Sequence, residues 1–285
     1  MSDSTCVVPV GTARLRVDHS GDPAAPIHLV FLHAGVADRR MWADQQRALA
    51  ARCHTLAYDR RGFGATEVVA GTGTEPAGFS HVGDLIGLLD ALRIDRAVLV
   101  GCSQGGRIAI DAALAHPARV RGLVLIAPAL SGEPQPPASA FAPAIAQRFD
   151  ELQAACDRGD MAAANELETR LWLDGPLQPP GRVGGAARAL VLDMNAIALR
   201  RGTPAGEAEP PSARERLREL KLPTLLLCGS FDFPTQIALV GRMAQQILGA
   251  HSQTIEGVAH LPSVERPQVV DAALERYLDA LPPDA

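Results

Sequence analysis

A serine stands between glycines in a setting that suits nucleophilic catalysis. The motif Gly101-Cys102-Ser103-Gln104-Gly105 follows the apolar run at residues 98–100 and precedes a segment with helical periodicity. A strand, a sharp glycine-flanked turn and a helix together expose a serine hydroxyl above a sheet edge. The N-terminus of the helix favours negative charge that develops there. The pattern therefore predicts Ser103 as a nucleophile.

A serine hydroxyl is a poor nucleophile until a base removes its proton, so a histidine is required. His260 follows the strand-like segment 252–255, which brings it to the edge where Ser103 lies. His251 precedes the same segment and would lie at the opposite edge, and His116 ends the helix after the motif. We therefore expect His260 to act as the base.

The base in turn needs a carboxylate that fixes its tautomer and stabilises its charged form. Asp232 follows the apolar strand pattern at residues 224–229, so it emerges at the same sheet edge. The segment after the strand pattern at 120–126 contains no acidic residue. Ser103, Asp232 and His260 thus form the predicted catalytic triad.

Backbone N–H groups must also stabilise the negative oxygen of a tetrahedral intermediate. The strand pattern at 27–32 leads into the loop His33-Ala34-Gly35-Val36. We expect an amide from this loop, that of Gly35, to act with the amide of Gln104 as the oxyanion hole. Val36 remains the alternative donor in the loop.

Alternating strand and helix patterns predict the scaffold for these residues, an α/β fold with a mostly parallel sheet and helices on both faces. Strands are expected over residues 13–19, 27–32, 54–58, 97–100, 120–126, 224–228 and 252–255. Helices are expected over residues 42–51, 79–92, 104–115, 144–157, 161–173, 186–200, 235–248 and 268–281.

The composition changes at Ser131, where a proline-rich stretch begins and strand patterns cease. Only helical patterns follow until a loop rich in Gly, Pro and Glu at residues 202–211. We therefore divide the chain into a first core part at 1–131, a helical insertion at 132–213 and a second core part at 214–285.

Charge and composition exclude several classes of function. The 285 residues carry a net charge of −5 and only one lysine, Lys221, which argues against a nucleic-acid partner. Arginine doublets at 39–40, 60–61 and 200–201 are interpreted as solvated or ion-paired surface. The sequence lacks an apolar stretch of membrane-spanning length and the motifs that bind phosphate, dinucleotide or metal. We expect neither cofactor nor metal nor membrane partner.

Five cysteines, odd in number and widely spaced, are typical of reduced thiols. The N-terminal residues lack the charged and apolar regions of a secretory signal. We therefore expect a soluble cytoplasmic protein, and the sequence leaves a homodimer open.

Five segments, in this order, resemble the α/β-hydrolase superfamily. Within it, the chain is similar to the capped small-molecule hydrolases that include 3-oxoadipate enol-lactonases and related bacterial esterases. The segments are Leu32-His33-Ala34-Gly35 leading to Met41-Trp42, Tyr58-Asp59-Arg60-Arg61-Gly62-Phe63-Gly64, the serine motif, Cys228-Gly229-Ser230-Phe231-Asp232, and Gly257 to His260 continuing to Glu265-Arg266-Pro267. The family's usual His-Gly is His33-Ala34 here, which is why the oxyanion donor could shift from Gly35 to Val36.

The resemblance implies a helical cap over the site and a cofactor-independent serine hydrolase that cleaves a small carboxylic ester or enol lactone. Hydrolysis of a C–C bond in a dienoic ketone is the alternative reaction, and a ligand-binding homologue without turnover is the non-enzymatic alternative. Relatives with an aspartate nucleophile, such as epoxide hydrolases, differ at the position of Ser103. Pocket candidates are Val36, Trp42, Trp172, Met194 and Phe233, and Arg170, Arg200 and Arg201 are candidates for binding a substrate carboxylate.

Overall fold

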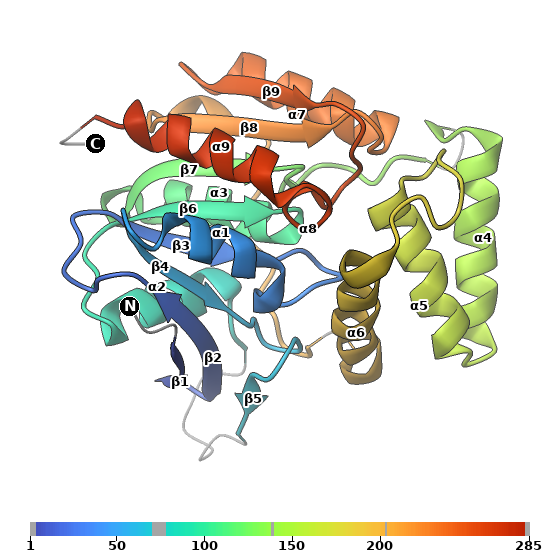
Figure 1. Cartoon of the computed structure of the whole chain (residues 1–285), viewed down its shortest axis with the longest axis horizontal. Coiled ribbons are helices and arrows are strands. Elements are labelled where there is room, and N and C mark those ends of the chain that lie inside the picture. The colour runs from blue at the N-terminus through green and yellow to red at the C-terminus, as the bar shows by residue number, and fades with distance from the viewer. Residues whose placement is uncertain (1–3, 70–77, 138–139, 203, 283–285) are drawn as a thin grey trace.

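A single twisted sheet crosses the centre of the molecule, as the computed structural model in Figure 1 shows. The structure describes residues 4–69, 78–137, 140–202 and 204–282. Within these residues the sheet has nine strands in the order β1-β2-β4-β3-β6-β7-β8-β9, and β5 pairs with β2. Strands β4, β3, β6, β7, β8 and β9 are parallel to one another, and β1, β2 and β5 pair antiparallel at one side. The predicted mostly parallel sheet is confirmed.

The strand bounds agree closely with the apolar runs of the sequence. The predicted strands appear as β2 Ala13–Ser20, β3 His28–Leu32, β4 His54–Tyr58, β6 Ala97–Cys102, β7 Val120–Ile126, β8 Thr224–Gly229 and β9 His251–Ile255. Two strands, β1 Ser4–Val10 and β5 Glu67–Val68, were not expected. Both lie at the sheet margin, where half-exposed residues leave no continuous apolar run, and both form by pairing with β2.

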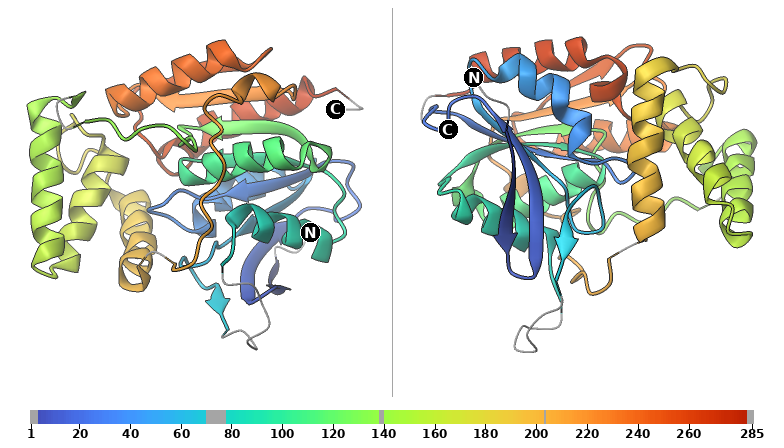
Figure 2. Two further views of the ribbon diagram at one scale, coloured as in Figure 1. Left: turned by 180° about the vertical axis from the view of Figure 1, so that it is seen from behind. Right: turned by 60° about the horizontal axis from the view of Figure 1, so that its bottom comes forward.

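Helices cover both faces of this sheet (Figure 2). The helices of the core are α1 Ala43–Leu49, α2 His81–Ala91, α3 Gln104–Ala115, α7 Pro234–Gln246, α8 Pro262–Glu265 and α9 Pro267–Asp279. Leu99 of β6 packs in the cluster with α2, α3 and α7, whereas its neighbours Val98 and Val100 pack in the cluster with α1 and α9. This alternation divides the apolar core into two layers.

Short helical turns account for the differences in helix bounds. The predicted helix at 42–51 divides into a 3-10 turn, Arg39–Trp42, and α1, because the Asp38 side chain accepts a hydrogen bond from Arg40 N and caps the turn. Two further 3-10 turns cover Pro117–Arg119 and Leu217–Glu219.

No helix in the described part of the chain is long and apolar enough to cross a membrane.

Between β7 and β8 the described residues form no further strand, and the α-helices there are α4 Pro143–Asp157, α5 Met161–Thr169 and α6 Gly185–Arg201. From here on, the insertion denotes the helical part of the predicted segment 132–213, namely residues 143–201. The predicted helix at 161–173 ends at Thr169 and continues as a π-helical turn, Arg170–Asp174, because Gly175 at φ 102° turns the chain away. The insertion stands as a separate group of helices beyond the ends toward which the parallel strands point (Figure 1).

Candidate active site

Ser103 occupies a strained turn between β6 and α3. Its φ of 52° and ψ of −116° are rare for a residue with a side chain. Hydrogen bonds from Ser103 N to Ile126 O (2.9 Å) and from Ala129 N to Ser103 O (3.0 Å) hold this conformation. A Cβ on Gly105 would lie 2.1 Å from Leu32 O, so glycine is required where α3 passes β3. The strained turn leaves the Ser103 side chain partly accessible at the carboxyl edge of the sheet.

His260 and Asp232 meet at the same edge, in the loops that follow β9 and β8. His260 Nδ1 lies 2.8 Å from Asp232 Oδ2 and 3.1 Å from Oδ1. Asp232 Oδ1 also accepts a hydrogen bond of 2.7 Å from Phe233 N. When Nδ1–H donates its hydrogen bond to the carboxylate, Nε2 of a neutral ring is left as the acceptor nitrogen. Nε2 is buried and has no hydrogen-bond partner among the described residues.

The residue before Ser103 connects the serine turn with the histidine loop. Cys102 is fully buried, and its thiol donates to the carbonyl oxygen of His260 across 3.6 Å. Burial raises the pKa of this thiol, and the nearby Asp232 raises it further. Cys102 therefore lies beneath the site as a neutral packing residue, and the accessible hydroxyl is that of Ser103.

Trp172, in the π-helical turn of the insertion, packs against the histidine. The two rings lie 4.7 Å apart at 49°, and His260 N donates to Trp172 O across 3.2 Å. Arg182 strengthens this junction, because it donates to the carbonyls of Leu173 and Gly257 and forms an ion pair with Glu265. The insertion thus contacts the site directly.

The two predicted oxyanion segments lie side by side. A Cβ on Gly35 would come within 2.9 Å of Gln104 Nε2, so the Gln104 side chain packs over the glycine. Arg60 Nη1 donates to Gln104 Oε1 (3.2 Å), and Nη2 donates to the carbonyls of His33 and Ala34 (3.3 Å each). The loop after β3 and the first residue of α3 are therefore joined through one arginine.

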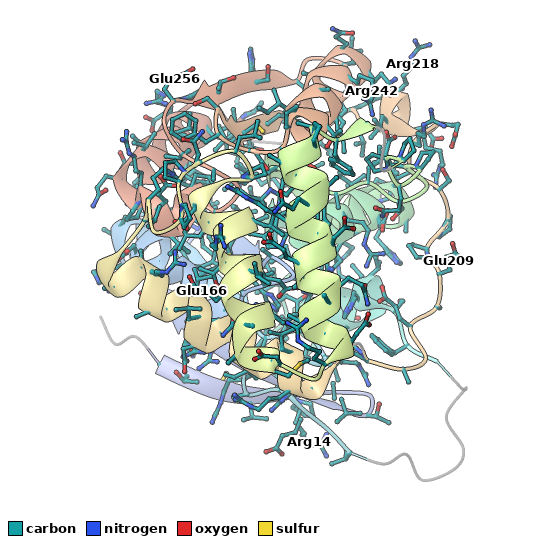
Figure 3. All side chains as sticks on the ribbon, turned by 90° about the vertical axis from the view of Figure 1, so that its right-hand side faces the viewer. Arg14, Glu166, Glu209, Arg218, Arg242 and Glu256 are labelled. Atoms are coloured by element: carbon teal, nitrogen blue, oxygen red, sulfur yellow. The ribbon has the colours of Figure 1, made fainter. Side chains whose placement is uncertain are left out.

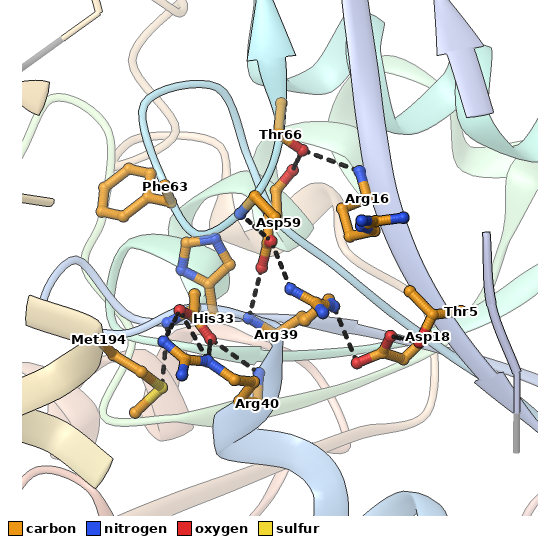
Figure 4. Close-up of polar contacts among 12 residues, drawn as sticks. Thr5, Arg16, Asp18, His33, Arg39, Arg40, Asp59, Phe63, Thr66 and Met194 are labelled. Carbon is orange, nitrogen blue, oxygen red and sulfur yellow. Dashed lines mark hydrogen bonds and ion pairs between the residues drawn. The ribbon is translucent and has the colours of Figure 1, made fainter. Parts of the chain in front are cut away.

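A second network, drawn in Figure 4, anchors the same loops. Asp59 is fully buried and accepts hydrogen bonds from Arg39 N (2.9 Å) and Arg39 Nη1 (2.6 Å). Thr66 Oγ1 donates to Asp59 O (2.7 Å) and accepts from Arg16 N (2.9 Å). These contacts fix the segments after β3 and β4 relative to each other.

A cavity of about 610 Å³ opens beside Gly35, Val36 and Gln104. Glu168 and Asn195 of the insertion and Glu207 of the following loop line its other walls. Asn195 Nδ2 donates to Glu168 Oε2 (2.6 Å), and burial raises the pKa of this carboxyl group. Within the described residues Glu168 has no cationic partner.

Several other titratable residues line the cavity wall, and two of them form an ion pair. Arg107 pairs with Glu207 at 2.8 Å. Burial, helped by Arg60, lowers the pKa of His81 to about 3, so this ring is neutral. Glu209 adds a further carboxylate, labelled in the side view of Figure 3. The wall is therefore polar, and within the described residues its charges outside ion pairs are the carboxyl groups of Glu168 and Glu209 and the guanidinium of Arg60.

The pocket candidates lie in different environments. Val36 lines the cavity, and Trp172 contacts His260. Phe233 is buried between α4 and the π-helical turn, 4.9 Å from the Trp172 ring. Met194 is buried, and its sulfur accepts a hydrogen bond from Asp38 N.

Trp42 belongs to the core and not to a pocket wall, because it is fully buried against Phe31 at a ring distance of 5.0 Å. The candidate arginines of the insertion also lie outside the cavity wall. Arg201, for example, donates to the carbonyls of Phe63 and Thr66.

One arginine doublet differs from its interpretation as surface. Arg60 is 1% exposed and Arg61 is 6% exposed. Arg61 is paired with Asp84 at 2.8 and 3.0 Å, whereas Arg60 bonds only to neutral acceptors. Arg60 and Glu168 are among the polar wall residues that the sequence does not single out, since neither belongs to a motif with a predicted partner.

Comparison with known proteins agrees with this architecture. Epoxide hydrolase A of Mycobacterium tuberculosis (strain ATCC 25618 / H37Rv) is 27% identical over 320 aligned positions, which cover 96% of this chain and 97% of that protein. The 3-oxoadipate enol-lactonase 1 of Acinetobacter baylyi (strain ATCC 33305 / BD413 / ADP1) is 26% identical, with 89% of each chain covered. The crystal structure of esterase RhEst1 from Rhodococcus sp. ECU1013 superposes with a TM-score of 0.75 at 23% identity, over 99% of this chain and 100% of that one. The model of the alpha/beta hydrolase family matches residues 29–273, and the chain therefore belongs to this family.

Proposed function

We propose that the chain is a cofactor-independent serine hydrolase that cleaves a small carboxylic ester or lactone through an acyl-enzyme. The observation that carries the proposal is the buried His260–Asp232 pair, whose Nε2 is left without a partner at the edge where the serine turn lies. An unpartnered buried acceptor is costly, and a catalytic role accounts for that cost.

In the proposed reaction Ser103 Oγ attacks the carbonyl carbon while His260 Nε2 takes the hydroxyl proton. The tetrahedral intermediate places its negative oxygen against the amides of Gly35 and Gln104, with Val36 as the alternative loop donor. His260 then protonates the leaving alcohol, and the acyl group stays on Ser103. A water molecule, deprotonated by His260, releases the acid and restores the hydroxyl.

Asp232 carries out two tasks in this scheme. Its two contacts with Nδ1 hold the imidazole in the tautomer that accepts a proton at Nε2. Its negative charge also stabilises the imidazolium that forms during attack. Its own orientation is fixed by the hydrogen bond from Phe233 N.

Relatives of similar identity have names that point to different chemistries, an epoxide hydrolase and an enol-lactonase. A serine at the turn supports acyl transfer, because its ester intermediate is opened by water attack at the acyl carbon. The residue at the turn is Ser103, which favours the ester or lactone reaction over epoxide opening.

The cavity wall supports a substrate without a free carboxylate. Glu168 and Glu209 add negative charge to the wall, and Arg107 is already paired with Glu207. The one unpaired cation of the wall within the described residues, Arg60, already donates from both Nη atoms to Gln104, His33 and Ala34. A substrate carboxylate in this space would lie near uncompensated acidic groups, which costs binding energy in a partly buried site. We therefore favour small neutral esters or lactones over an oxoadipate-type acid.

The test uses 4-nitrophenyl acetate hydrolysis together with fluorophosphonate labelling and intact mass measurement. Ser103→Ala should abolish labelling and lower turnover by about 10⁴-fold or more, with unchanged thermal unfolding. Cys102→Ala is the matched control next to the nucleophile, and it should label and turn over like the wild type. Labelling of Ser103→Ala, or an inactive Cys102→Ala, would overturn the assignment.

Two further outcomes separate the alternatives. C–C bond hydrolysis would be supported if the protein labels with the fluorophosphonate and cleaves a ring-cleavage dienoate but hydrolyses no short ester or lactone. A wild-type protein that neither labels nor turns over would support a ligand-binding role for the fold.

A further inference from the structure

Arg60 is a buried cation with no carboxylate partner among the described residues. Its guanidinium is fixed by neutral acceptors, the side-chain oxygen of Gln104 and the carbonyls of His33 and Ala34. It also stacks on the Phe63 ring, 4.4 Å from the ring centre. Its neighbour Arg61, equally part of the loop after β4, shows the ordinary arrangement, since it forms a two-fold ion pair with Asp84.

The surroundings of Arg60 keep its charge uncompensated. His33 Nε2 accepts from Arg60 N (3.1 Å), so Nδ1 carries the proton that is donated to Ala34 O (2.8 Å). Burial, together with the charge of Arg60, holds the pKa of His33 well below its usual range. Burial also lowers the pKa of Arg60 to about 10, which leaves it charged at neutral pH. A single positive charge therefore lies inside the loop.

Such a charge costs stability, because within the described residues it has neutral hydrogen-bond acceptors and no carboxylate in an ion pair. The three acceptors of Arg60 come from the two segments that hold Gly35 and the Gln104 amide. The Gln104 side chain packs over Gly35, so its position affects the space between the two amides. In a partly dry site a fixed positive charge also favours a nearby anion more strongly than in water.

We propose that Arg60 is the positioning residue of the oxyanion hole, tying the loop after β3 to the serine turn through Gln104 and favouring the anionic tetrahedral state. This inference rests on the proposed hydrolase function. Arg60 acts through the segments it joins and through its charge, because Nη1 and Nη2 already donate hydrogen bonds within the protein.

The test compares Arg60→Met with Arg61→Met, two changes of equal size in adjacent buried residues. Arg60→Met should lower kcat by about 100-fold, the loss typical of one oxyanion donor, with KM within about threefold of the wild type. Its thermal unfolding temperature should stay the same or rise, since an uncompensated buried charge is removed. Arg61→Met should do the reverse, lowering the unfolding temperature while keeping kcat per folded molecule, because it leaves Asp84 unpaired.

A second readout separates positioning from general damage. A trifluoromethyl ketone forms an anionic tetrahedral adduct with the serine, whereas the corresponding methyl ketone binds mainly as an uncharged carbonyl. Affinity for the trifluoromethyl ketone should fall in parallel with kcat in Arg60→Met, and affinity for the methyl ketone should stay within about threefold. Arg60→Lys, which keeps the charge but has one nitrogen for three acceptors, should fall between the wild type and Arg60→Met.

Gln104→Met provides a variant at an exposed position, where folding is not at risk. It removes the acceptor of Arg60 Nη1 and keeps the backbone amide, so kcat should fall about tenfold without a change in KM. The inference is overturned if Arg60→Met keeps kcat within threefold, if its kcat loss follows a loss of unfolding temperature, or if Gln104→Met is unaffected. Failure of the wild type to label with a fluorophosphonate would instead overturn the proposed function.

Discussion

The sheet core and the insertion differ in the contacts that stabilise each of them. In the core, both faces of the sheet are covered by fully buried aliphatic side chains that form two continuous clusters. In the insertion, α4 buries only Ile145 and Ala155. A few apolar contacts, those of Leu173, Val191 and Met194 in the core cluster and of Leu171 with Phe233, act there together with polar contacts. Asp174, for example, is fully buried and accepts from Gly181 N, Val183 N and Arg188.

This difference assigns different tasks to the two regions. Aliphatic packing is dense and fixes backbone geometry, as the strained turn at Ser103 requires. Polar contacts between helices depend on a few pairs, such as Arg40–Asp193 and Arg182–Glu265, which join the insertion to the core. The core therefore suits the proposed reaction, and we expect the insertion to select the substrate. Figure 3 shows the outer face of the insertion, with Glu166 on its surface.

The largest effect is expected when the core chemistry is broken without touching the insertion. Asp232→Asn keeps the size of the side chain and an acceptor for Phe233 N, but it favours the wrong imidazole tautomer. We expect kcat to fall by about 10⁴-fold with unchanged unfolding temperature. Steady-state kinetics with a 4-nitrophenyl ester measures it, and activity within tenfold of the wild type would mean that another carboxylate serves His260.

The next largest effect is expected from a substitution at the ion pair that joins the insertion to the core. Arg182→Met leaves Glu265, which is 6% exposed on its side chain, buried without its cation. Removal of one partner from such a pair costs about 3–5 kcal/mol, and calorimetry should show a clear fall in unfolding temperature. Arg47→Met is the control, because the Arg47–Asp44 pair is exposed at 70% and 50% and should contribute little. Equal shifts in the two variants would contradict polar anchoring of the insertion.

Acid should lower the stability of the core through two histidines at the amino ends of the parallel strands. There His54 Nδ1 lies 3.1 Å from His28 Nδ1. Burial lowers the pKa of His54 from 6.5 to about 4, so the unfolded chain binds a proton that the folded chain does not. Stability is therefore complete above pH 6.5 and falls as the pH drops toward 4, by about 3 kcal/mol.

Urea unfolding between pH 7.5 and 4.5 measures this loss, and His54→Gln should flatten the slope. A slope that is the same in His54→Gln would place the acid-sensitive group elsewhere. Activity loss over the same range is a separate observable, because the triad lies at the other edge.

The smallest effect is expected from the insertion alone. Glu168→Gln removes a wall charge, so kcat/KM for a 4-nitrophenyl succinate monoester should rise about tenfold while that for the neutral butyrate stays within twofold. Glu166→Gln, on the same helix and 48% exposed, is the control and should change neither value. A rise for both esters, or for neither, would remove Glu168 from substrate selection.

The local parts of this architecture could be predicted from the sequence. The bounds of β7 and α3 agree with the prediction to the residue, because a continuous apolar run and a glycine turn are local signals. The carboxyl-edge placement of Asp232 and His260 follows equally from the strands that precede them.

Other features depend on partners far apart in the chain. Arg60 appeared as a surface residue, and its burial depends on acceptors at residues 33, 34 and 104, which no window around it contains. Trp42 was placed near the pocket by its position after the oxyanion loop, but its ring turns inward against Phe31. The π-helical turn that brings Trp172 to His260 has no sequence pattern of its own.

That contact gives the molecule a built-in optical reporter. The chain has two tryptophans, Trp42 in the core and Trp172 against the imidazole of His260. A protonated imidazole quenches the emission of a neighbouring indole, whereas Trp42 is shielded from the site. The emission of Trp172 therefore follows the protonation of His260 and the seating of the insertion, with Trp42 as an internal reference and no attached dye.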